Sequence, residues 1–192
     1  MILEAGKKIY FASDFHLGAP SHEKSRERED KIVRWLNSIQ DSAQEIYLVG
    51  DLFDFWFEHK FTIPKGFIRL QGKIAELTDA GIPVHVFTGN HDMWMFDYLP
   101  KEIGIQLYRE PIVREYNSKK FFIGHGDGLG PGDKGYKFLK KVFANKFCQW
   151  CFARLHPNFS FWLANTSSKK SRLHTSVDDE KYLGDDKEWL AI

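Results

Sequence analysis

Four short polar motifs occur along the chain in a fixed order, and each follows directly on an apolar run. The motifs are Asp14-Phe15-His16, Gly50-Asp51-Leu52-Phe53-Asp54, Gly89-Asn90-His91-Asp92 and Gly124-His125-Gly126-Asp127. Together they offer carboxylates, imidazoles and one carboxamide oxygen, which are the groups that bind a pair of divalent metals. Two metals about 3.5–4 Å apart can clamp a phosphoryl group and generate hydroxide at neutral pH. The motifs therefore predict metal-assisted hydrolysis of a phosphate ester or anhydride.

The apolar runs explain how distant motifs can meet. They read as strands, and ligands collect outside the carboxyl ends of the strands in an open α/β sheet. Asp14 and His16 are two residues apart, so both side chains point the same way on an extended segment. Asp51 has two oxygens with which to bridge two cations, Asn90 offers a neutral oxygen, and His125 offers a nitrogen. We expect these five side chains to hold the metals.

The donor set also restricts the metal and suggests a catalytic group. Mixed carboxylate, imidazole and amide ligation suits Mn²⁺, Fe²⁺ or Zn²⁺ better than Mg²⁺ alone. His91 lies beside Asn90 and is expected to protonate the leaving oxygen or to stabilise its charge. Asp92 is expected to orient His91, while Asp54 and Asp127 are expected to orient metal ligands.

Each motif taken singly also fits a simple turn, because Gly-Asp and Gly-Asn are common turn dipeptides. Four motifs in one order, each after an apolar run, are hard to obtain from turns alone. The metal-site hypothesis is therefore preferred. His85, by contrast, lies inside a strand and is expected to be structural.

Composition and pattern indicate the class of protein. The 192 residues, 43% of them apolar and 28% charged, suit a single domain over 1–192 with a sizeable core. A net charge of +1 gives no basic field for nucleic acid. No apolar stretch approaches the ~20 residues of a membrane span, and the N-terminus lacks a signal-peptide layout. A cytoplasmic protein is expected.

Strand and helix patterns alternate in the first half of the chain, which predicts an α/β fold with parallel strands and helical crossovers. The expected elements there are a strand at 8–13, a helix at 27–40, a strand at 45–49, a helix at 65–79 and a strand at 84–88. A short helix near 93–98, ending at Pro100, should follow. Short strands are then expected at 105–107, 112–116 and 120–123, the last two joined in a hairpin at Asn117-Ser118.

The segment of about 135–165 is mostly helical and crowded with Phe and Trp, between which Lys and Arg are interleaved. Pro157 is expected to separate two helices. Such aromatics can pack the helices onto the core, and a helix needs only part of its circumference for that packing.

At the four motifs the sequence resembles the calcineurin-like metallophosphoesterase superfamily. The resemblance implies a four-layer αββα sandwich and a dinuclear metal site. The implied metal ligands are Asp14, His16, Asp51, Asn90 and His125. Asp51 would bridge the two divalent ions, and His91 would be the catalytic histidine.

Within the superfamily, the chain looks most like the UDP-2,3-diacylglucosamine hydrolases of lipid A biosynthesis. Phe55-Trp56 after the second motif, and Asp133 with Gly135-Tyr136 before the aromatic segment, carry this likeness. It implies attack on the α-phosphorus of UDP-2,3-diacylglucosamine, giving UMP and 2,3-diacylglucosamine 1-phosphate (lipid X), typically with Mn²⁺. It also implies a helical lid at about 135–165, a nucleotide-linked glycolipid substrate and peripheral association with the inner membrane. No protein partner is implied.

The same resemblance suggests which residues contact the substrate. They are Asn90, His91, Asp133, Lys169 and Arg172. Lys169 and Arg172 belong to an Asn/Ser/Lys-rich run over 165–172 whose register is open, and a solvated loop is the alternative there.

Two features depart from the hydrolase family. His91 stands where that family often has Arg, although His is the residue of the wider superfamily. No Gly-His-x-His motif follows His125, so two imidazole ligands and the last strands are missing up to Ile192. Weak metal binding and low turnover are therefore expected of this chain. The alternatives are a metallophosphoesterase or phosphodiesterase with another substrate, and a non-catalytic module of the same fold.

Overall fold

The computed structural model describes residues 1–127, 134–164 and 166. The chain divides into two compact units, Met1–Asp127 and Gly128–Ile192. Each unit is described by itself below. A single domain that includes a helical lid stays a prediction.

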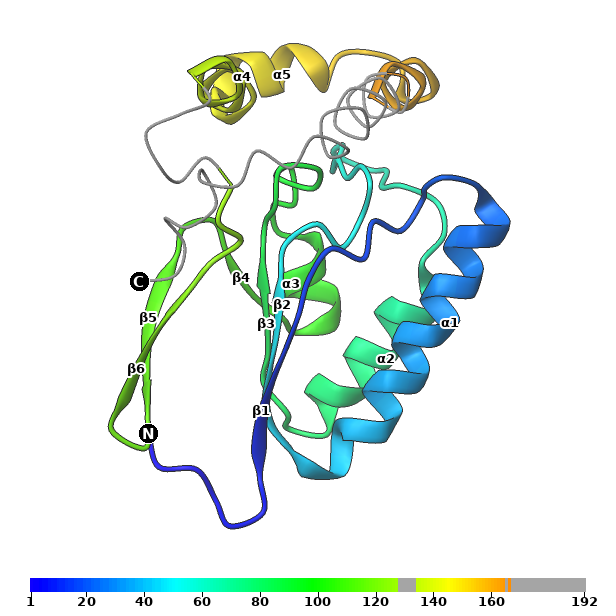
Figure 1. The fold of residues 1–192 in the computed structure, drawn as a ribbon. Helices are drawn as coiled ribbons and strands as arrows, with labels where there is room; N and C mark the ends of the chain where they lie inside the picture. The colour runs from blue at the N-terminus through cyan, green and yellow to red at the C-terminus, as the bar shows by residue number, and fades with distance from the viewer. Residues whose placement is uncertain (128–133, 165, 167–192) are drawn as a thin grey trace, which may run out of the picture. The chain divides into compact units, whose positions relative to one another are not determined.

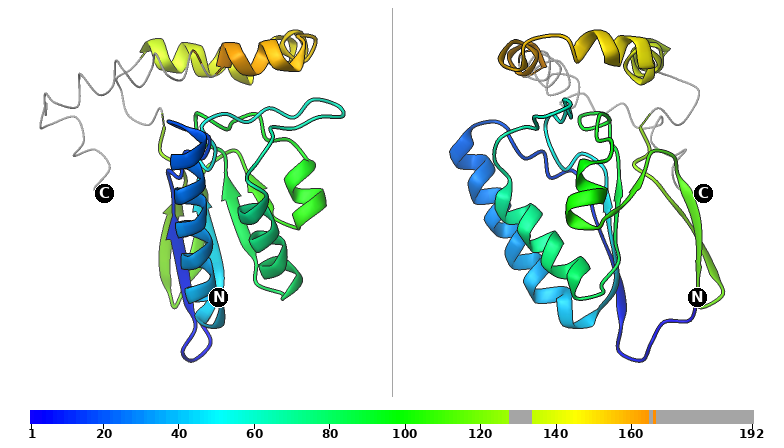
Figure 2. Two further views of the ribbon diagram at one scale, coloured as in Figure 1. Left: turned by 90° about the vertical axis from the view of Figure 1, so that its right-hand side faces the viewer. Right: turned by 180° about the vertical axis from the view of Figure 1, so that it is seen from behind.

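The first unit is built on a parallel sheet in the order β1-β2-β3-β4. Its strands are β1 (Lys8–Ala12), β2 (Ala43–Val49), β3 (Val84–Phe87) and β4 (Gln106–Tyr108). One face is covered by α1 (His22–Ile39), α2 (Ile68–Asp79) and α3 (Tyr98–Ile103), with a short 3-10 turn at Gln40–Ser42 after α1. Over the other face lies an antiparallel hairpin of β5 (Ile112–Tyr116) and β6 (Lys119–Ile123) (Figures 1 and 2). This arrangement confirms the predicted α/β fold and its parallel strands.

Two apolar clusters hold these layers together. The larger one lies between the helices and the sheet and includes Leu36, Leu48 and Leu70, each fully buried. The smaller cluster lies between the sheet and the hairpin. Its buried members are Tyr47, Phe87, Tyr116 and Ile123.

A polar contact also ties the hairpin to the sheet. The Tyr116 hydroxyl on β5 donates to the Glu45 carboxylate on β2 and contacts the Tyr47 hydroxyl. His85 stacks on Tyr47 with ring centroids 4.3 Å apart and is only 3% exposed. His85 is therefore buried in this layer, as the sequence predicted for a structural residue.

Two helices differ from the sequence-based prediction. α1 begins five residues earlier than expected, because the Ser21 hydroxyl accepts a hydrogen bond from the Lys24 amide at 3.3 Å and caps the helix. The first turn carries no apolar residue, so the apolar period could not detect it. The helix predicted near 93–98 and ending at Pro100 is wrong. The observed helix is α3, and Pro100 lies in its first turn, where no helical N–H is required.

The three later strands belong to two different sheets. β4 pairs in parallel with β3 and so belongs to the first sheet. The predicted hairpin is confirmed. Its turn residues Asn117 and Ser118 both have positive φ, 49° and 63°, as a two-residue type I′ turn requires.

The described part of the second unit is helical, with α4 (Lys134–Ala144), α5 (Lys146–Phe152) and a further helical stretch over 157–164. Pro157 begins that last stretch, as predicted. An additional break at Asn145 was not predicted; its side chain caps α5 by accepting from the amides of Phe147 at 2.8 Å and Cys148 at 3.2 Å.

Large aromatic side chains of this unit are exposed to solvent. The most exposed are Phe138 (69%), Phe147 (70%), Trp150 (53%) and Trp162 (60%). Among the described residues, no helix combines the length and apolar character needed to cross a bilayer.

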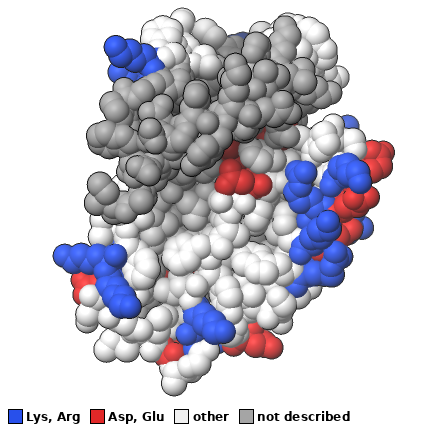
Figure 3. Space-filling view, in the orientation of Figure 1, with Lys and Arg blue, Asp and Glu red and all other residues white. Residues whose placement is uncertain are grey.

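Charges on the α1 side of the first unit are mixed. Basic and acidic side chains alternate along this helix, and Figure 3 shows both signs side by side there. Arg26, for example, pairs with Glu29 and Asp30, each at 2.9 Å. This face therefore carries no single sign of charge.

Candidate metal centre

The loops that leave β1 and β2 run side by side beyond the ends of the strands. The amides of Asp14, His16 and Leu17 donate to the carbonyls of Gly50, Asp51 and Leu52 at 3.1, 2.8 and 3.0 Å. These bonds extend the parallel pairing past the sheet. The first two motifs are thereby brought next to each other, as the strand-end argument predicted.

Three predicted metal ligands have left-handed backbone conformations. The φ angles are 59° at Asp14, 44° at His16 and 53° at Asp51. Such angles are uncommon outside glycine, and strained residues of this kind concentrate at functional sites. The motif residues are therefore held in a conformation that ordinary strand ends do not need.

Two motif glycines are required by close approach rather than by turn geometry alone. A Cβ added to Gly89 would lie 2.1 Å from Asp51 Oδ1 and 2.6 Å from the Asp51 amide nitrogen. A Cβ added to Gly50 would lie 2.5 Å from His125 Nδ1. The site is therefore packed so tightly that side chains at these two positions would displace metal-ligand candidates.

Asp51 lies at the centre of the cluster and is only 3% exposed. Its Oδ2 is 3.8 Å from His16 Nε2 and 3.5 Å from His125 Nε2, while its Oδ1 accepts from the His91 amide at 2.9 Å. Burial acts to raise the pKa of Asp51, but the hydrogen bond from His125 and the amide of His91 outweigh it, so the pKa is lowered. One carboxylate oxygen thus faces two imidazoles, as a bridging ligand should.

The remaining ligand candidates lie on either side of Asp51. His16 Nε2 is 3.8 Å from Asp14 Oδ1, and ligand atoms of Asp14, His16 and Asp51 all fall within 4.8 Å of one another. Asn90 Oδ1 is 3.3 Å from His125 Nε2. The structure therefore brings together all five side chains that the sequence predicted.

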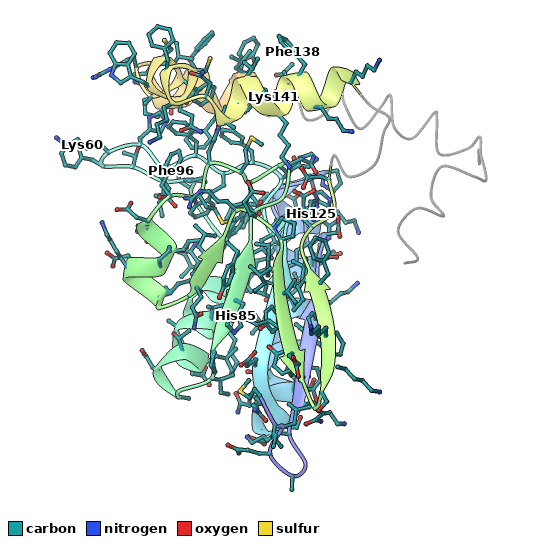
Figure 4. All side chains as sticks on the ribbon, turned by 90° about the vertical axis from the view of Figure 1, so that its left-hand side faces the viewer. Lys60, His85, Phe96, His125, Phe138 and Lys141 are labelled. Atoms are coloured by element: carbon teal, nitrogen blue, oxygen red, sulfur yellow. The ribbon has the colours of Figure 1, made fainter. Side chains whose placement is uncertain are left out.

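His125 is delivered by the end of β6 (Figure 4). Its Nδ1 contacts the Val49 carbonyl at 3.0 Å, which turns Nε2 toward Asp51 and Asn90. Burial lowers the pKa of His125, but the hydrogen bond and charge of Asp51 dominate together with smaller contributions that include the charge of Asp127, and the pKa is raised to about 9. The charge of Asp127 thus contributes to the pKa of His125, while its expected role in orienting that ligand stays a prediction.

His91 stands at the edge of this cluster. Its ring meets that of His16 edge-on, with centroids 4.9 Å apart. His91 Nδ1 lies 3.0 Å from the Asp54 carbonyl oxygen and 3.6 Å from Asp54 Oδ1. Asp54 therefore orients the ring and leaves Nε2 as the nitrogen that can face a substrate.

The prediction that Asp92 orients His91 is wrong. The Asp92 carboxylate is fully buried and accepts from the amides of Leu52 at 2.7 Å, Phe53 at 3.3 Å and Gly89 at 2.8 Å. Asp92 fastens the second motif to the third instead. The residue that orients the His91 ring is Asp54, although the sequence predicted that Asp54 would orient metal ligands. The Gly-Asp-x-x-Asp spacing was the signal for Asp54, but it could not show which imidazole lay nearby.

The remaining predicted substrate contacts, Asp133, Lys169 and Arg172, lie outside the described residues. The chemistry of the described donors fits two divalent metals. Asp14, His16 and Asp51 form one group, and Asp51, Asn90 and His125 form the other. Each group mixes oxygen and imidazole nitrogen donors, which first-row divalent metals accept.

Comparison with known proteins identifies relatives of this chain. The UDP-2,3-diacylglucosamine hydrolase of Porphyromonas gingivalis is 40% identical over 178 residues, which cover 92% of this chain and 67% of that protein. The hydrolase of the same name from Histophilus somni is 28% identical and covers 90% of this chain and 73% of its own. The chain thus spans about two thirds to three quarters of these relatives.

A solved structure of a protein of unknown function from Aquifex aeolicus covers 73% of this chain and 74% of its own, at 18% identity and a TM-score of 0.44. That likeness is too distant to inform the fold. The sequence model of the calcineurin-like phosphoesterases, however, matches residues 7–185. The chain belongs to the calcineurin-like phosphoesterase family of metal-dependent hydrolases.

Proposed function

We propose that this protein hydrolyses the pyrophosphate of UDP-2,3-diacylglucosamine and releases UMP and 2,3-diacylglucosamine 1-phosphate. The substrate is suggested by the names of the relatives, one of which is 40% identical to this chain. The observation that carries the chemistry is the position of Asp51, whose Oδ2 faces both His16 and His125 at 3.8 and 3.5 Å. A buried carboxylate between two imidazoles is suited to bridging two cations.

In this proposal Asp14, His16 and Asp51 hold one metal, while Asp51, Asn90 and His125 hold the second. We propose Mn²⁺, since it accepts carboxylate, imidazole and amide ligands together. Bound at such a site, a metal pair neutralises charge on the phosphoryl group and lowers the pKa of water. The left-handed backbone of Asp14, His16 and Asp51 helps to fix the donors of the first group before any metal arrives.

His91 has the properties of a group that assists the leaving oxygen. Its Nδ1 lies 3.0 Å from the Asp54 carbonyl, an acceptor, so Nδ1 carries a proton. The Asp54 Oδ1 atom lies 3.6 Å from the same nitrogen. In its imidazolium form, His91 can donate a proton or a hydrogen bond from Nε2 to the departing phosphate oxygen. Asn90 and His91 are also proposed to contact the substrate, as are Asp133, Lys169 and Arg172.

The exposed aromatics of the second unit are proposed to bind the acyl chains and the membrane surface. Phe147 and Trp150 stack with centroids 6.0 Å apart, and the Arg154 guanidinium lies 4.7 Å from the Trp150 ring. Apolar side chains beside basic ones match a lipid whose chains are apolar and whose headgroup is anionic. We therefore propose a peripheral association with the inner membrane from the cytoplasmic side.

The proposal is tested by hydrolysis of UDP-2,3-diacylglucosamine in ¹⁸O-labelled water with Mn²⁺. Attack on the α-phosphorus breaks the bond between that phosphorus and the bridging oxygen, so the label enters UMP and not the sugar phosphate. The variant His91→Gln should lose at least 100-fold in turnover. His22→Gln serves as the control, because His22 is exposed at the start of α1.

Other outcomes would indicate a different function. Turnover of bis(p-nitrophenyl) phosphate without release of UMP would indicate a phosphodiesterase with another substrate. Fewer than two bound metals with no turnover of either compound would indicate a non-catalytic module.

A further inference from the structure

One arginine holds the loop that carries the first motif. Arg28 lies on α1, and its Nη1 donates to the carbonyls of Phe15 at 3.0 Å, His16 at 2.9 Å and Ala19 at 3.3 Å. Sequence reasoning gave Arg28 no role, since it lies within a run of charged residues that reads as a solvated helix face. The structure instead turns its guanidinium onto the backbone beside a metal-ligand candidate.

The loop needs such a contact because its conformation is unusual. Asp14 and His16 both have positive φ, at 59° and 44°. Around them the carbonyls of Phe15, His16 and Ala19 converge on one nitrogen, and converging carbonyl dipoles repel unless a donor lies among them. A cationic N–H group forms stronger hydrogen bonds to these oxygens than a neutral donor does.

The loop is held on two sides. On one side its amides pair with the loop after β2. On the other side α1 supplies two side chains three residues apart, which therefore lie on one helix face. Arg28 takes the carbonyls, and the Ser25 hydroxyl accepts from the Gly18 amide at 2.8 Å. Ser25 is only 6% exposed.

The charge of Arg28 has no other evident use. Its neighbour Arg26 pairs with Glu29 and Asp30, each at 2.9 Å. Within the part of the chain that the structure describes, no carboxylate lies within 4.0 Å of the Arg28 guanidinium nitrogens. Its contacts go to the loop carbonyls, and a partly buried cation of this kind usually has a paired anion.

We propose that Arg28 is a positioning residue for the metal centre. By holding the backbone of His16 it keeps the imidazole 3.8 Å from both Asp14 Oδ1 and Asp51 Oδ2. Arg28 bonds to the carbonyls of the first loop and makes no direct hydrogen bond to Asp51, Asn90 or His125 among the described residues, so we expect the second group to be affected less. The inference rests on the proposed function, since it presumes that the two groups bind metal.

The test measures Mn²⁺ binding by the whole chain, by calorimetry and by the electron paramagnetic resonance of free Mn²⁺. Outer residues that orient metal ligands typically change affinity 10–100-fold when they are removed. Arg28→Ala should therefore weaken one of the two Mn²⁺ ions by 10–100-fold and leave the other within about threefold. Arg28→Lys keeps the charge but ends one bond short of the position of Nη1, and should weaken the same ion by a smaller factor.

Two controls separate positioning from general damage. Arg34→Ala removes an exposed arginine from the same helix and should change neither ion. Guanidinium chloride at millimolar, non-denaturing concentration should restore part of the lost affinity in Arg28→Ala and do nothing to the wild type.

The outcomes are distinguishable. If the wild type binds no Mn²⁺, the proposed metal centre fails and this inference fails with it. If the wild type binds two ions and folded Arg28→Ala binds both equally well, only the inference is overturned. Equal weakening of both ions without rescue by guanidinium also overturns it, because that pattern indicates loss of stability alone. Should Arg28→Ala not fold, unchanged binding by Arg28→Lys overturns it.

Discussion

The buried carboxylate of Asp92 should make the free energy of unfolding depend on pH, and the variant Asp92→Asn measures by how much. Asp92→Asn keeps the shape of the side chain, removes its charge and turns one oxygen into an NH₂ group. Burial first, and the charge of Asp51 second, raise the pKa of Asp92 from 3.8 to about 7 in the metal-free protein. The amides of Gly89, Phe53 and Leu52 act in the opposite direction but do not cancel the effect.

The raised pKa fixes the direction of the pH dependence. A carboxyl that binds its proton more tightly in the folded state contributes stability below about pH 4 and loses it as the pH rises through about 7. At about 1.36 kcal/mol per pKa unit, the whole loss is about 4 kcal/mol. About 3 kcal/mol of it falls between pH 5 and pH 8. Asn does not titrate, so the variant escapes this loss.

The substitution also has a cost that does not depend on pH. If the amide oxygen of Asn keeps the hydrogen bonds from Leu52 and Phe53, its NH₂ group faces the amide of Gly89. A buried N–H left without an acceptor costs about 1–3 kcal/mol. We therefore expect Asp92→Asn to be close to the wild type or below it in stability at pH 5, and above it at pH 8.

Urea unfolding at pH 5, 6, 7 and 8 with a chelator present measures this difference. The free energy of unfolding of the variant, relative to the wild type, should shift by about 3 kcal/mol in its favour between pH 5 and pH 8. Asp79→Asn, at the exposed end of α2, is the control and should shift by less than about 0.5 kcal/mol. A difference that stays constant across this range would refute the reasoning, because Asp92 would then not titrate between pH 5 and pH 8.

Three further predictions concern metal and lipid. Asp51→Ala should reduce bound Mn²⁺ from two ions per chain to fewer than one, as measured by elemental analysis; two retained ions would contradict the bridging role. Mn²⁺ affinity should rise from pH 6 to pH 9, because the metal must displace a proton from His125, whose pKa is about 9. Calorimetry in buffers of different ionisation enthalpy should detect the released proton. Binding that does not change with pH would contradict this prediction. The double variant Phe147→Ser/Trp150→Ser should lose at least 10-fold in kcat/KM for the diacylated substrate but not for its deacylated form, and an equal loss for both would argue against an acyl-binding role.

The sequence predicted where the site lies because strand ends are set by local apolar runs. Asp14, Asp51 and Asn90 follow runs that form strands of the parallel sheet, so its topology was enough to bring them together, whereas His125 follows β6 of the antiparallel hairpin. The left-handed backbone of Asp14, His16 and Asp51 and the close approach at Gly89 could not be read in the same way, since both depend on how neighbouring loops pack.

Roles that depend on contacts between loops were the hardest to predict. Asp92 is adjacent to His91 in sequence, yet Asp54, 37 positions away, is the residue that contacts the ring. The start of α1 after its cap at Ser21 was not predicted, because the first turn of this helix is polar and shows no apolar period. Arg28 carried no signal at all, because a cation that binds backbone carbonyls looks like any other charged residue on a helix.

The hairpin of β5 and β6 has a thermodynamic consequence. A small apolar cluster and several polar contacts, among them Tyr116 with Glu45 and Arg114 with Tyr108, attach it to the sheet, and its end delivers His125 to Asp51 across that junction. A metal bound to both binds only the docked state, and by mass action it stabilises docking by about 2.7 kcal/mol at 100 times its dissociation constant. Local opening of the hairpin, visible as amide hydrogen exchange in β5 and β6, should therefore slow as metal is added, while exchange in α1 stays unchanged. The concentration of metal would then determine how long the β5–β6 hairpin stays docked on the sheet, in addition to supporting hydrolysis at the site.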